Sequence, residues 1–137
     1  MKIKLFNKNI QLPEKKREGD AGWDIYLPKD VIFKSKEVTT IDLGFGVKLP
    51  SGYAGLFAMR SSVCQTGMII QMPLIDENYL GSLHLIIFNG TDSDYYYKKN
   101  DRVCSLFIFP IYNDKLEIVE DLGTSERNDS WNGSSGR

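Results

Sequence analysis

Short apolar runs that alternate with polar positions recur along the chain, and residues typical of turns separate them. Such runs predict short β-strands. No segment keeps apolar residues at helical spacing, so we expect at most a turn or two of helix, directly after Arg60. Regular short strands predict an all-β sandwich or small barrel. Strands are expected near residues 3–5 and 31–33, and over residues 38–49, 53–59, 68–72, 83–88, 103–111 and 116–119.

Length and composition narrow the class of protein. A chain of 137 residues with 42% hydrophobic residues fits one compact domain with its own core. Its 17 basic and 18 acidic residues give a net charge of −1, so we expect no general nucleic-acid binding. No apolar stretch approaches the ~20 residues that span a bilayer, and we expect a cytoplasmic protein without a membrane segment. Cys64 and Cys104 are expected to be reduced, buried thiols.

The end of the chain differs in composition from the rest. From Thr124 onward it holds Ser, Asn, Gly and Arg, with Trp131 as its only large apolar residue. We therefore divide the chain into a β-barrel body over residues 1–123 and an arm over residues 124–137. From composition alone the arm is either a frayed terminus or a mobile segment that orders over a ligand.

Polar clusters interrupt the strands at five places. Carboxylates can hold a divalent metal, arginines bind phosphate, and a glycine-rich tail can close over a ligand. These are the groups that a nucleoside-triphosphate hydrolase needs. The clusters are residues 21–24, 60–62, 74–81, 101–103 and 127–136.

The residues alone leave the roles of two clusters open. Asp24 follows a small Ala-Gly pair and an aromatic residue, and it either holds a hydrated divalent ion or caps a turn. Arg60, Ser61 and Ser62 follow an expected strand, where an arginine fork and two hydroxyls suit phosphate oxygens. The alternative is an arginine paired with a surface carboxylate and a serine that caps the helix.

The cluster at residues 74–81 places a carboxylate and an aromatic ring at a turn. Asp76 is either a partly desolvated base that polarises a water for attack on phosphorus or an ordinary turn acid. Tyr79 either stacks against a sugar or base or provides packing. His84, the only histidine, lies in an expected strand and is assigned to structure.

Three further features are assigned to structure or solvent. We expect Arg102 to pair with a neighbouring acid rather than to bind phosphate. Cys104 and Ser105 alternate in one strand, so one of them faces the interior. The basic run at residues 15–17 is bracketed by two glutamates that offset most of its charge, and we expect it to be solvated.

Taken together and in this order, the clusters resemble the five motifs of the trimeric dUTP diphosphatase (dUTPase) family. The resemblance covers nearly the whole chain. One such motif is weak support, but five in order in a chain of this length are specific. The matching segments are Ala21-Gly22-Trp23-Asp24, Arg60-Ser61-Ser62, LIDENYLG at residues 74–81, DRVCSL at residues 101–106, and Glu126-Arg127 with GSSG at residues 133–136.

This resemblance implies a jelly-roll-like all-β fold, a distorted barrel of short strands that assembles as a homotrimer. Active sites would lie at subunit interfaces, with the flexible C-terminal arm of one subunit closing over a site built by the others. The implied reaction converts dUTP and water to dUMP and pyrophosphate, with Mg²⁺ bridging the triphosphate.

The resemblance also implies roles for single residues. Asp76 would orient and deprotonate the water that attacks the α-phosphorus, and Asp24 would hold Mg²⁺ through water. Tyr79 would lie under the deoxyribose and exclude a 2′-hydroxyl, while the hairpin around Asp76 and Gly81 would read uracil through backbone groups. Arg127 and the two arm serines would clamp the γ-phosphate. The implied substrate-binding residues are Arg60, Ser61, Ser62, Tyr79, Gly81, Ser105, Arg127, Trp131, Ser134 and Ser135.

The chain departs from the family's pattern in three places. Ser105 stands where the fourth motif usually has Gln, which shortens one polar contact near the phosphates or the water. Met72-Pro73 stands where the third motif often has Gly. In the arm, Asn132 occupies the usual base-stacking aromatic position. Either the arm shifts by one residue so that Trp131 covers the uracil, or the arm stacks differently.

Two alternatives to the dUTP diphosphatase remain. The related dCTP deaminases share the fold and an Arg-Ser-Ser motif, but they use a Glu in the strand after the hairpin. Residues 82–89 hold no acid, which disfavours the deaminase. The second alternative is a trimeric protein that binds dUTP and regulates a partner protein, either as a second role or as its only role.

Overall fold

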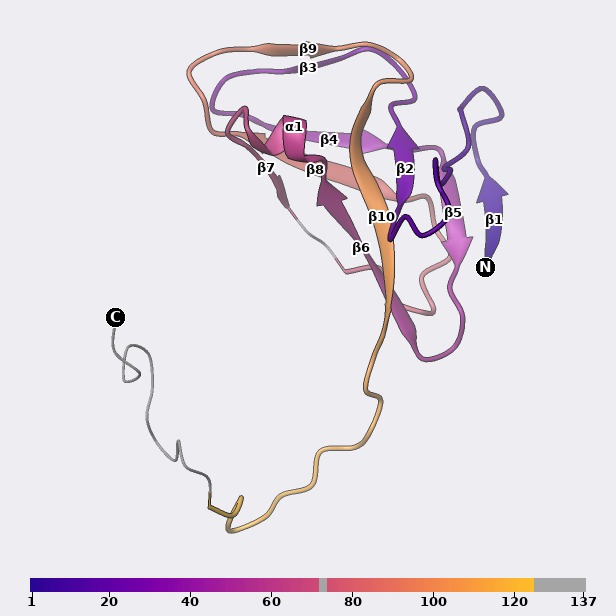
Figure 1. Cartoon of the computed structure of the whole chain (residues 1–137), viewed down its shortest axis with the longest axis vertical. Helices are drawn as coiled ribbons and strands as arrows, with labels where there is room; N and C mark the ends of the chain where they lie inside the picture. Colours follow the sequence, from indigo (N-terminus) through magenta and orange to yellow (C-terminus); the bar gives the residue numbers. More distant parts are fainter. Residues whose placement is uncertain (72–73, 125–137) are drawn as a thin grey trace.

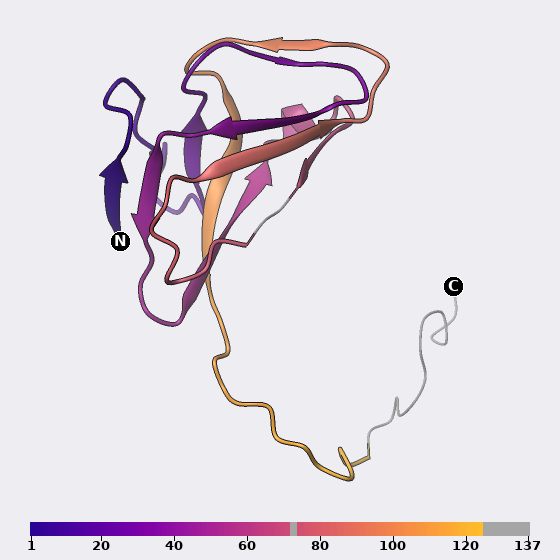
Figure 2. The same cartoon turned by 180° about the vertical axis from the view of Figure 1, so that it is seen from behind.

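The computed structural model describes residues 1–71 and 74–124, and antiparallel strands dominate it (Figures 1 and 2). Within these residues the one helix has four residues, and no helix is long and apolar enough to cross a membrane. The elements are β1 (Lys2–Leu5), β2 (Trp23–Tyr26), β3 (Val31–Phe33), β4 (Val38–Asp42), β5 (Phe45–Lys48), β6 (Tyr53–Met59), α1 (Ser61–Cys64), β7 (Met68–Gln71), β8 (His84–Asn89), β9 (Tyr95–Tyr97) and β10 (Arg102–Pro110).

The strands pair in four small antiparallel sheets, with orders β1-β5, β2-β10-β6, β3-β9 and β4-β8-β7. Strands far apart in the sequence are neighbours, as in β10, which lies between β2 and β6. In this register Ser105 stands opposite Asp24 on one side and Ala58 on the other. Such long-range antiparallel pairing is typical of jelly-roll-like barrels, so the predicted fold class is confirmed.

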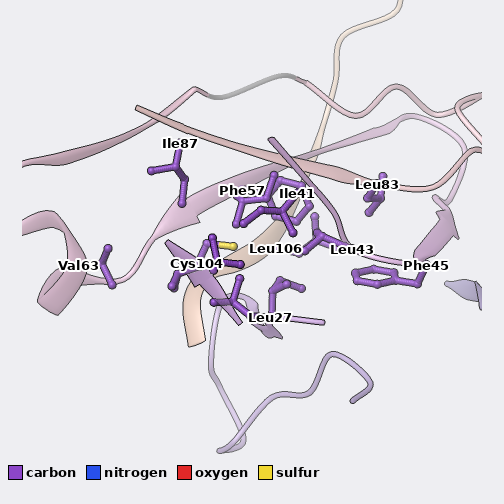
Figure 3. Close-up of a cluster of buried hydrophobic side chains, with 14 of the residues drawn as sticks. Leu27, Ile41, Leu43, Phe45, Phe57, Val63, Leu83, Ile87, Cys104 and Leu106 are labelled. Atoms are coloured by element: carbon purple, nitrogen blue, oxygen red, sulfur yellow. The ribbon is translucent and has the colours of Figure 1, made fainter. Parts of the chain in front are cut away.

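The alternation of the strands explains where the core lies. Along β8, Leu85 and Ile87 are fully buried while His84 is exposed, because successive side chains point to opposite faces. Apolar side chains from several sheets meet inside the barrel, among them Phe45 and Phe57 (Figure 3). This packed interior fixes the strand ends that carry the polar clusters.

The two cysteines are free thiols, as expected, but they differ in environment. Cys104 is buried in the core, and this burial raises the pKa of its thiol. Cys64 is exposed at the end of α1, so the prediction that it is buried is wrong. The short helix turns this side chain away from the core and buries only Val63.

The prediction of a strand at residues 116–119 is wrong, because residues 111–124, the described part of the chain after β10, form no strand or helix. Residues 111–124 extend away from the barrel, as Figure 1 shows. Leu116 and Ile118 are fully exposed. Their alternation with polar residues is a strand pattern, but a strand needs a partner edge, and the described part of this single chain offers none here. The boundary at residue 123 stays a prediction, and residues 125–137 lie outside the described residues.

Candidate active site

A polar cavity of about 670 Å³ opens where the loop before β2 meets β10 and the start of α1. It brings together residues from three of the predicted clusters, at positions 21–24, 60–62 and 101–103. Its walls also include residues from the loop before β2, which the sequence alone assigned to solvent. The lining residues are Lys16, Arg17, Asp20, Ala21, Gly22, Asp24, Arg60, Ser61, Arg102, Ser105 and Phe107.

Asp24 is the centre of the hydrogen bonding in this cavity. Its Oδ2 accepts hydrogen bonds from Nη1 of Arg60 at 3.0 Å and from Nη1 of Arg102 at 2.6 Å. Its Oδ1 accepts one from the Ser105 hydroxyl at 3.0 Å. The sheet dictates this arrangement, because Ser105 on β10 faces Asp24 on β2, and the Arg60 N–H is bonded to the Val103 carbonyl at 3.0 Å.

The charges around Asp24 keep its carboxylate ionised. Burial by itself would raise the pKa of Asp24, since the side chain is only 16% exposed. Hydrogen bonds from Arg102 and Ser105 and the positive charges of Arg60 and Arg102 outweigh burial, and they hold the pKa of Asp24 below its ordinary value. One carboxylate between two guanidinium groups leaves a net positive site that suits an anion such as phosphate.

The donor set fits a metal ion only through water. Among residues 1–71 and 74–124, no group of three His, Cys, Asp or Glu side chains could hold an ion. Asp24 already accepts three hydrogen bonds, two of them from cations, which disfavours direct ligation. A carboxylate has about four acceptor positions, so roughly one remains for a metal-bound water. The water-mediated role of Asp24 therefore stays a prediction.

The two serines after Arg60 keep their hydroxyls available. Helix α1 begins after Arg60 without a hydrogen bond from a capping side chain, so the structure does not support a serine cap. Both Ser61 and Ser62 are exposed, but only Ser61 lines the polar cavity of this chain.

Gly22 allows the loop before β2 to lie close against β10. A Cβ at this position would lie 3.0 Å from Cβ of Ser105, 3.1 Å from the Leu106 carbonyl oxygen and 3.1 Å from the Phe107 ring. A larger residue would force the loop and β10 apart, and Asp24 with Ser105 would separate. This close approach is the physical reason for Gly22 in the first cluster.

A second cavity, of about 220 Å³ and mainly apolar, lies beside Tyr79. The Tyr79 hydroxyl donates a hydrogen bond to the Ser82 carbonyl at 2.8 Å. Its ring lies over Gly81, where a Cβ would come within 2.7 Å of the Tyr79 hydroxyl oxygen. Gly81 thus lets the ring fold back onto the chain, while 45% of the Tyr79 surface stays exposed to a ligand. The lining residues are Phe57, Leu74, Ile75, Tyr79, Leu83, His84 and Ile86.

Asp76 lines neither of these cavities and is exposed in the single chain, so its predicted role as the base stays a prediction. The neighbouring acid has the structural role instead. Glu77 accepts a hydrogen bond from the Gly52 N–H at 2.8 Å, and hydrogen bonds from Gly52 and Ser51 lower the pKa of Glu77. One chain therefore does not bring Asp76 into the cavity that holds Asp24.

Several assignments made from sequence can be compared with these two cavities. Arg102 forms the expected ion pair, and its partner is Asp24. Cys104 faces the interior and Ser105 faces Asp24, as their alternation predicts. Sequence reasoning missed Arg17 in the polar cavity and His84 in the apolar one. The nearness of the basic run to the first cluster was the available signal for Arg17.

Comparison with known proteins shows the family. The family model for dUTPase matches residues 8–136, nearly the whole chain. The chain belongs to the dUTPase family. The predicted family and hydrolase class are confirmed, and the assignment of the clusters to single motifs stays a prediction.

Relatives of this dUTPase span its full length. The deoxyuridine 5′-triphosphate nucleotidohydrolase of Clostridioides difficile is 30% identical over 139 residues, covering 99% of this chain and 97% of that protein. The corresponding protein of Syntrophotalea carbinolica is 32% identical over 141 residues, covering 99% of this chain and 96% of that protein.

Solved structures of phage dUTPases share the fold of this chain. A mutant of the Staphylococcus bacteriophage 80alpha dUTPase with dUpNHpp has a TM-score of 0.93 and 30% identity, covering 99% of this chain and 98% of that one. A mutant dUTPase of phage phi11 of S. aureus has a TM-score of 0.81 and 26% identity, covering 88% and 97%. The phi11 structure is described as revealing the coordination of a structural Mg(II) ion.

Proposed function

We propose that this dUTPase hydrolyses dUTP to dUMP and pyrophosphate. The observation that carries the proposal is the polar cavity in which Asp24 holds Arg60 and Arg102 side by side. Two arginines with one shared carboxylate form a preorganised cationic site for a triphosphate. The Ser61 hydroxyl in the same wall adds a donor for phosphate oxygens, whereas the Ser105 hydroxyl donates to Asp24.

Magnesium enters this proposal as part of the substrate. Mg²⁺ bound to the triphosphate would neutralise charge on the phosphates and keep bound waters. The chain's own contribution is the remaining acceptor position of Asp24, which suits a metal-bound water. Arg60 and Ser61 would bind the phosphates and stabilise the leaving pyrophosphate.

The nucleoside half of the substrate is assigned to the hairpin around Asp76 and Gly81. Tyr79 lines the apolar cavity and lies over Gly81, which supports a role of the ring under the deoxyribose. Backbone groups of the hairpin would read uracil. Asp76 would deprotonate the water that attacks the α-phosphorus, in the role of a general base.

Separation of these parts in one chain supports a composite site in a homotrimer. Asp76 of one subunit would approach the Asp24 cavity of another. The arm would close over both from a third subunit, but its predicted contacts lie outside the described residues. These are Arg127, Trp131, Ser134 and Ser135. The cytoplasmic location also stays a prediction.

A pyrophosphate-release screen tests the proposed reaction. dUTP, dTTP, dCTP and UTP are compared with and without Mg²⁺ at equal enzyme concentration. We expect release from dUTP in the presence of Mg²⁺ and little from the others. Ammonia release from dCTP would instead support a deaminase, and no release from any nucleotide would refute the proposal.

A regulatory function is the second candidate. Phage 80alpha dUTPase is described as controlling the transfer of virulence genes by a G protein-like mechanism, and its structure with dUpNHpp matches this chain with a TM-score of 0.88. We propose partner regulation as an additional role. Tight dUpNHpp binding without steady-state dUTP turnover would favour the regulator over the enzyme.

Replacing Tyr79 by Ala is expected to weaken discrimination against ribonucleotides. Removing the ring opens room beside the sugar, so UTP gains access that its 2′-hydroxyl otherwise prevents. We expect the dUTP-to-UTP ratio of kcat/KM to fall by about 10-fold or more. The matched control is Tyr53→Ala on β6, because Tyr53 is 39% exposed and lines neither described cavity. An unchanged ratio in Tyr79→Ala would remove the ring from this role.

A mixture of two inactive variants is expected to regain activity if the site is composite. Asp76→Asn and Arg60→Gln each spoil every site in their own homotrimer. In mixed trimers prepared by co-expression, about a quarter of the sites would pair an intact Asp76 with an intact Arg60 from another subunit. Steady-state turnover of the mixture would show this recovery. A mixture as inactive as its components would place the whole site within one chain.

A further inference from the structure

The loop before β2 is folded against the polar cavity. Backbone hydrogen bonds join Glu14 and Asp24 in both directions, at 2.8 and 3.3 Å, and they fasten the start of the loop to β2. The Arg17 N–H donates to Oδ2 of Asp20 at 2.9 Å, and the Asp20 N–H donates to the Arg17 carbonyl at 3.2 Å. Gly19, at φ +88°, lets the chain turn between them. Arg17 is therefore held at the cavity wall by a closed turn.

Neighbouring cations already have partners. Lys15 lies over the Trp23 ring at 4.4 Å. Lys16 pairs with Glu14 and lies over the Tyr26 ring at 5.8 Å. These contacts hold the two lysines against β2 and the start of the loop, and Lys16, which also lines the cavity, already has its charge paired with Glu14.

The two deeper arginines of the cavity also share one carboxylate, that of Asp24. Among the residues that the structure describes, Arg17 is the cation of the cavity wall that forms no ion pair. A guanidinium that is placed at the wall without a carboxylate partner can bind an incoming anion without first breaking an ion pair. Its fork of donors matches phosphate oxygens.

We propose that Arg17 binds the outer phosphates of the nucleotide and thereby selects a triphosphate over a monophosphate. This inference rests on the proposed function, since it assumes that the polar cavity receives the phosphate chain. Arg60 and Arg102 surround Asp24 on the strand side, and Arg17 adds positive charge from the loop side of the same cavity. A monophosphate would contact the cations on only one side of the cavity, whereas a triphosphate is long enough to contact the strand side and the loop side together.

Calorimetric titration of the full chain tests the role of Arg17 without relying on turnover. The probes are dUpNHpp, inorganic tripolyphosphate and dUMP, and the variants are Arg17→Gln and Arg17→Lys. We expect Arg17→Gln to bind dUpNHpp and tripolyphosphate about 10-fold more weakly, as for the loss of a charged hydrogen bond, with dUMP affinity within about twofold. Arg17→Lys keeps the charge but loses the planar fork of donors. Its affinity for dUpNHpp and tripolyphosphate should therefore lie between that of the wild type and that of Arg17→Gln.

Lys15→Gln is the matched control, because it removes an equal charge from the same loop at a residue that does not line the cavity. Equal dUpNHpp affinity in Arg17→Gln and Lys15→Gln would overturn the inference. An equal loss of dUMP and dUpNHpp affinity would also overturn it, because it would show a general disturbance of the loop. Tripolyphosphate binding that depends on Arg17, in a wild-type protein that does not hydrolyse dUTP, would support the inference while the proposed function fails.

Discussion

Asp76→Asn is expected to bind dUpNHpp with nearly wild-type affinity and to lose about 10²-fold or more in kcat, in line with the loss of a general base. Asparagine preserves the shape of the side chain, but it cannot accept the proton of the attacking water. Asp76 is exposed and lines neither described cavity, so its loss should leave the fold intact. Calorimetry and pyrophosphate-release kinetics on the same preparations measure the two effects separately.

Glu77→Gln provides the control for this variant, because the two acids are adjacent in one turn. The Glu77 carboxylate accepts the Gly52 N–H at 2.8 Å, so its replacement should lower stability slightly and leave kcat within a few-fold of wild type. Near-normal turnover in Asp76→Asn would exclude Asp76 as the base. A loss of kcat in Glu77→Gln that exceeds the loss in Asp76→Asn would also exclude it. If Asp76→Asn does not fold, the Asp76 side chain contributes to stability in the proposed homotrimer, even though it is exposed in the single chain.

Asp24→Asn is expected to reduce both stability and catalysis. The variant leaves two guanidinium groups close together without the carboxylate between them. We expect the free energy of unfolding to fall by about 1–3 kcal/mol, the usual cost of leaving a partly buried polar partner unsatisfied. The arginines would also spread apart, so kcat/KM should fall by about 10²-fold. Urea unfolding at one fixed protein concentration measures the first effect, since assembly of the proposed homotrimer would contribute to stability.

The stability difference between wild type and Asp24→Asn should depend on pH in one direction. Because the folded protein holds the pKa of Asp24 below its ordinary value, the ionised side chain stabilises the fold at neutral pH. This contribution is present above the unfolded value of about 3.9 and disappears as the pH falls through the lower folded value. A difference that grows below about pH 4 would contradict the ion-pair arrangement.

Patterns that depend on near neighbours in the sequence were predicted best. The strand over residues 53–59 has the predicted bounds, and the short helix follows Arg60 as expected. Alternation in β10 correctly predicts that one of Cys104 and Ser105 faces the interior, and the structure shows that it is Cys104, while Ser105 lines the cavity. In these segments the spacing of apolar positions along the sequence already shows which face of the strand or helix packs against the core.

Errors arose where an outcome depends on contacts between distant segments. Leu116 and Ile118 alternate like a strand, but alternation does not say whether a partner edge exists. The nearness of Arg17 to the first cluster in the sequence is a weak signal, because its position at the cavity depends on Gly22 lying against β10 and on the bridge between Glu14 and Asp24. For Asp76, the sequence identifies a turn. The surroundings of its carboxylate, however, depend on which surface of another subunit packs against that turn in the proposed homotrimer.

A newly synthesised copy of this chain would carry Leu116, Ile118 and Leu122 almost fully in water, at 101%, 100% and 97% exposure. Covering such side chains gains about 1.5–3 kcal/mol each, which would favour early assembly of the proposed homotrimer. Until then the same surface is a target for chaperones and proteases and a starting point for aggregation. If the proposed homotrimer covers these side chains, the amount of this protein that survives in a cell depends on how quickly newly made copies meet, and so on how strongly its gene is expressed.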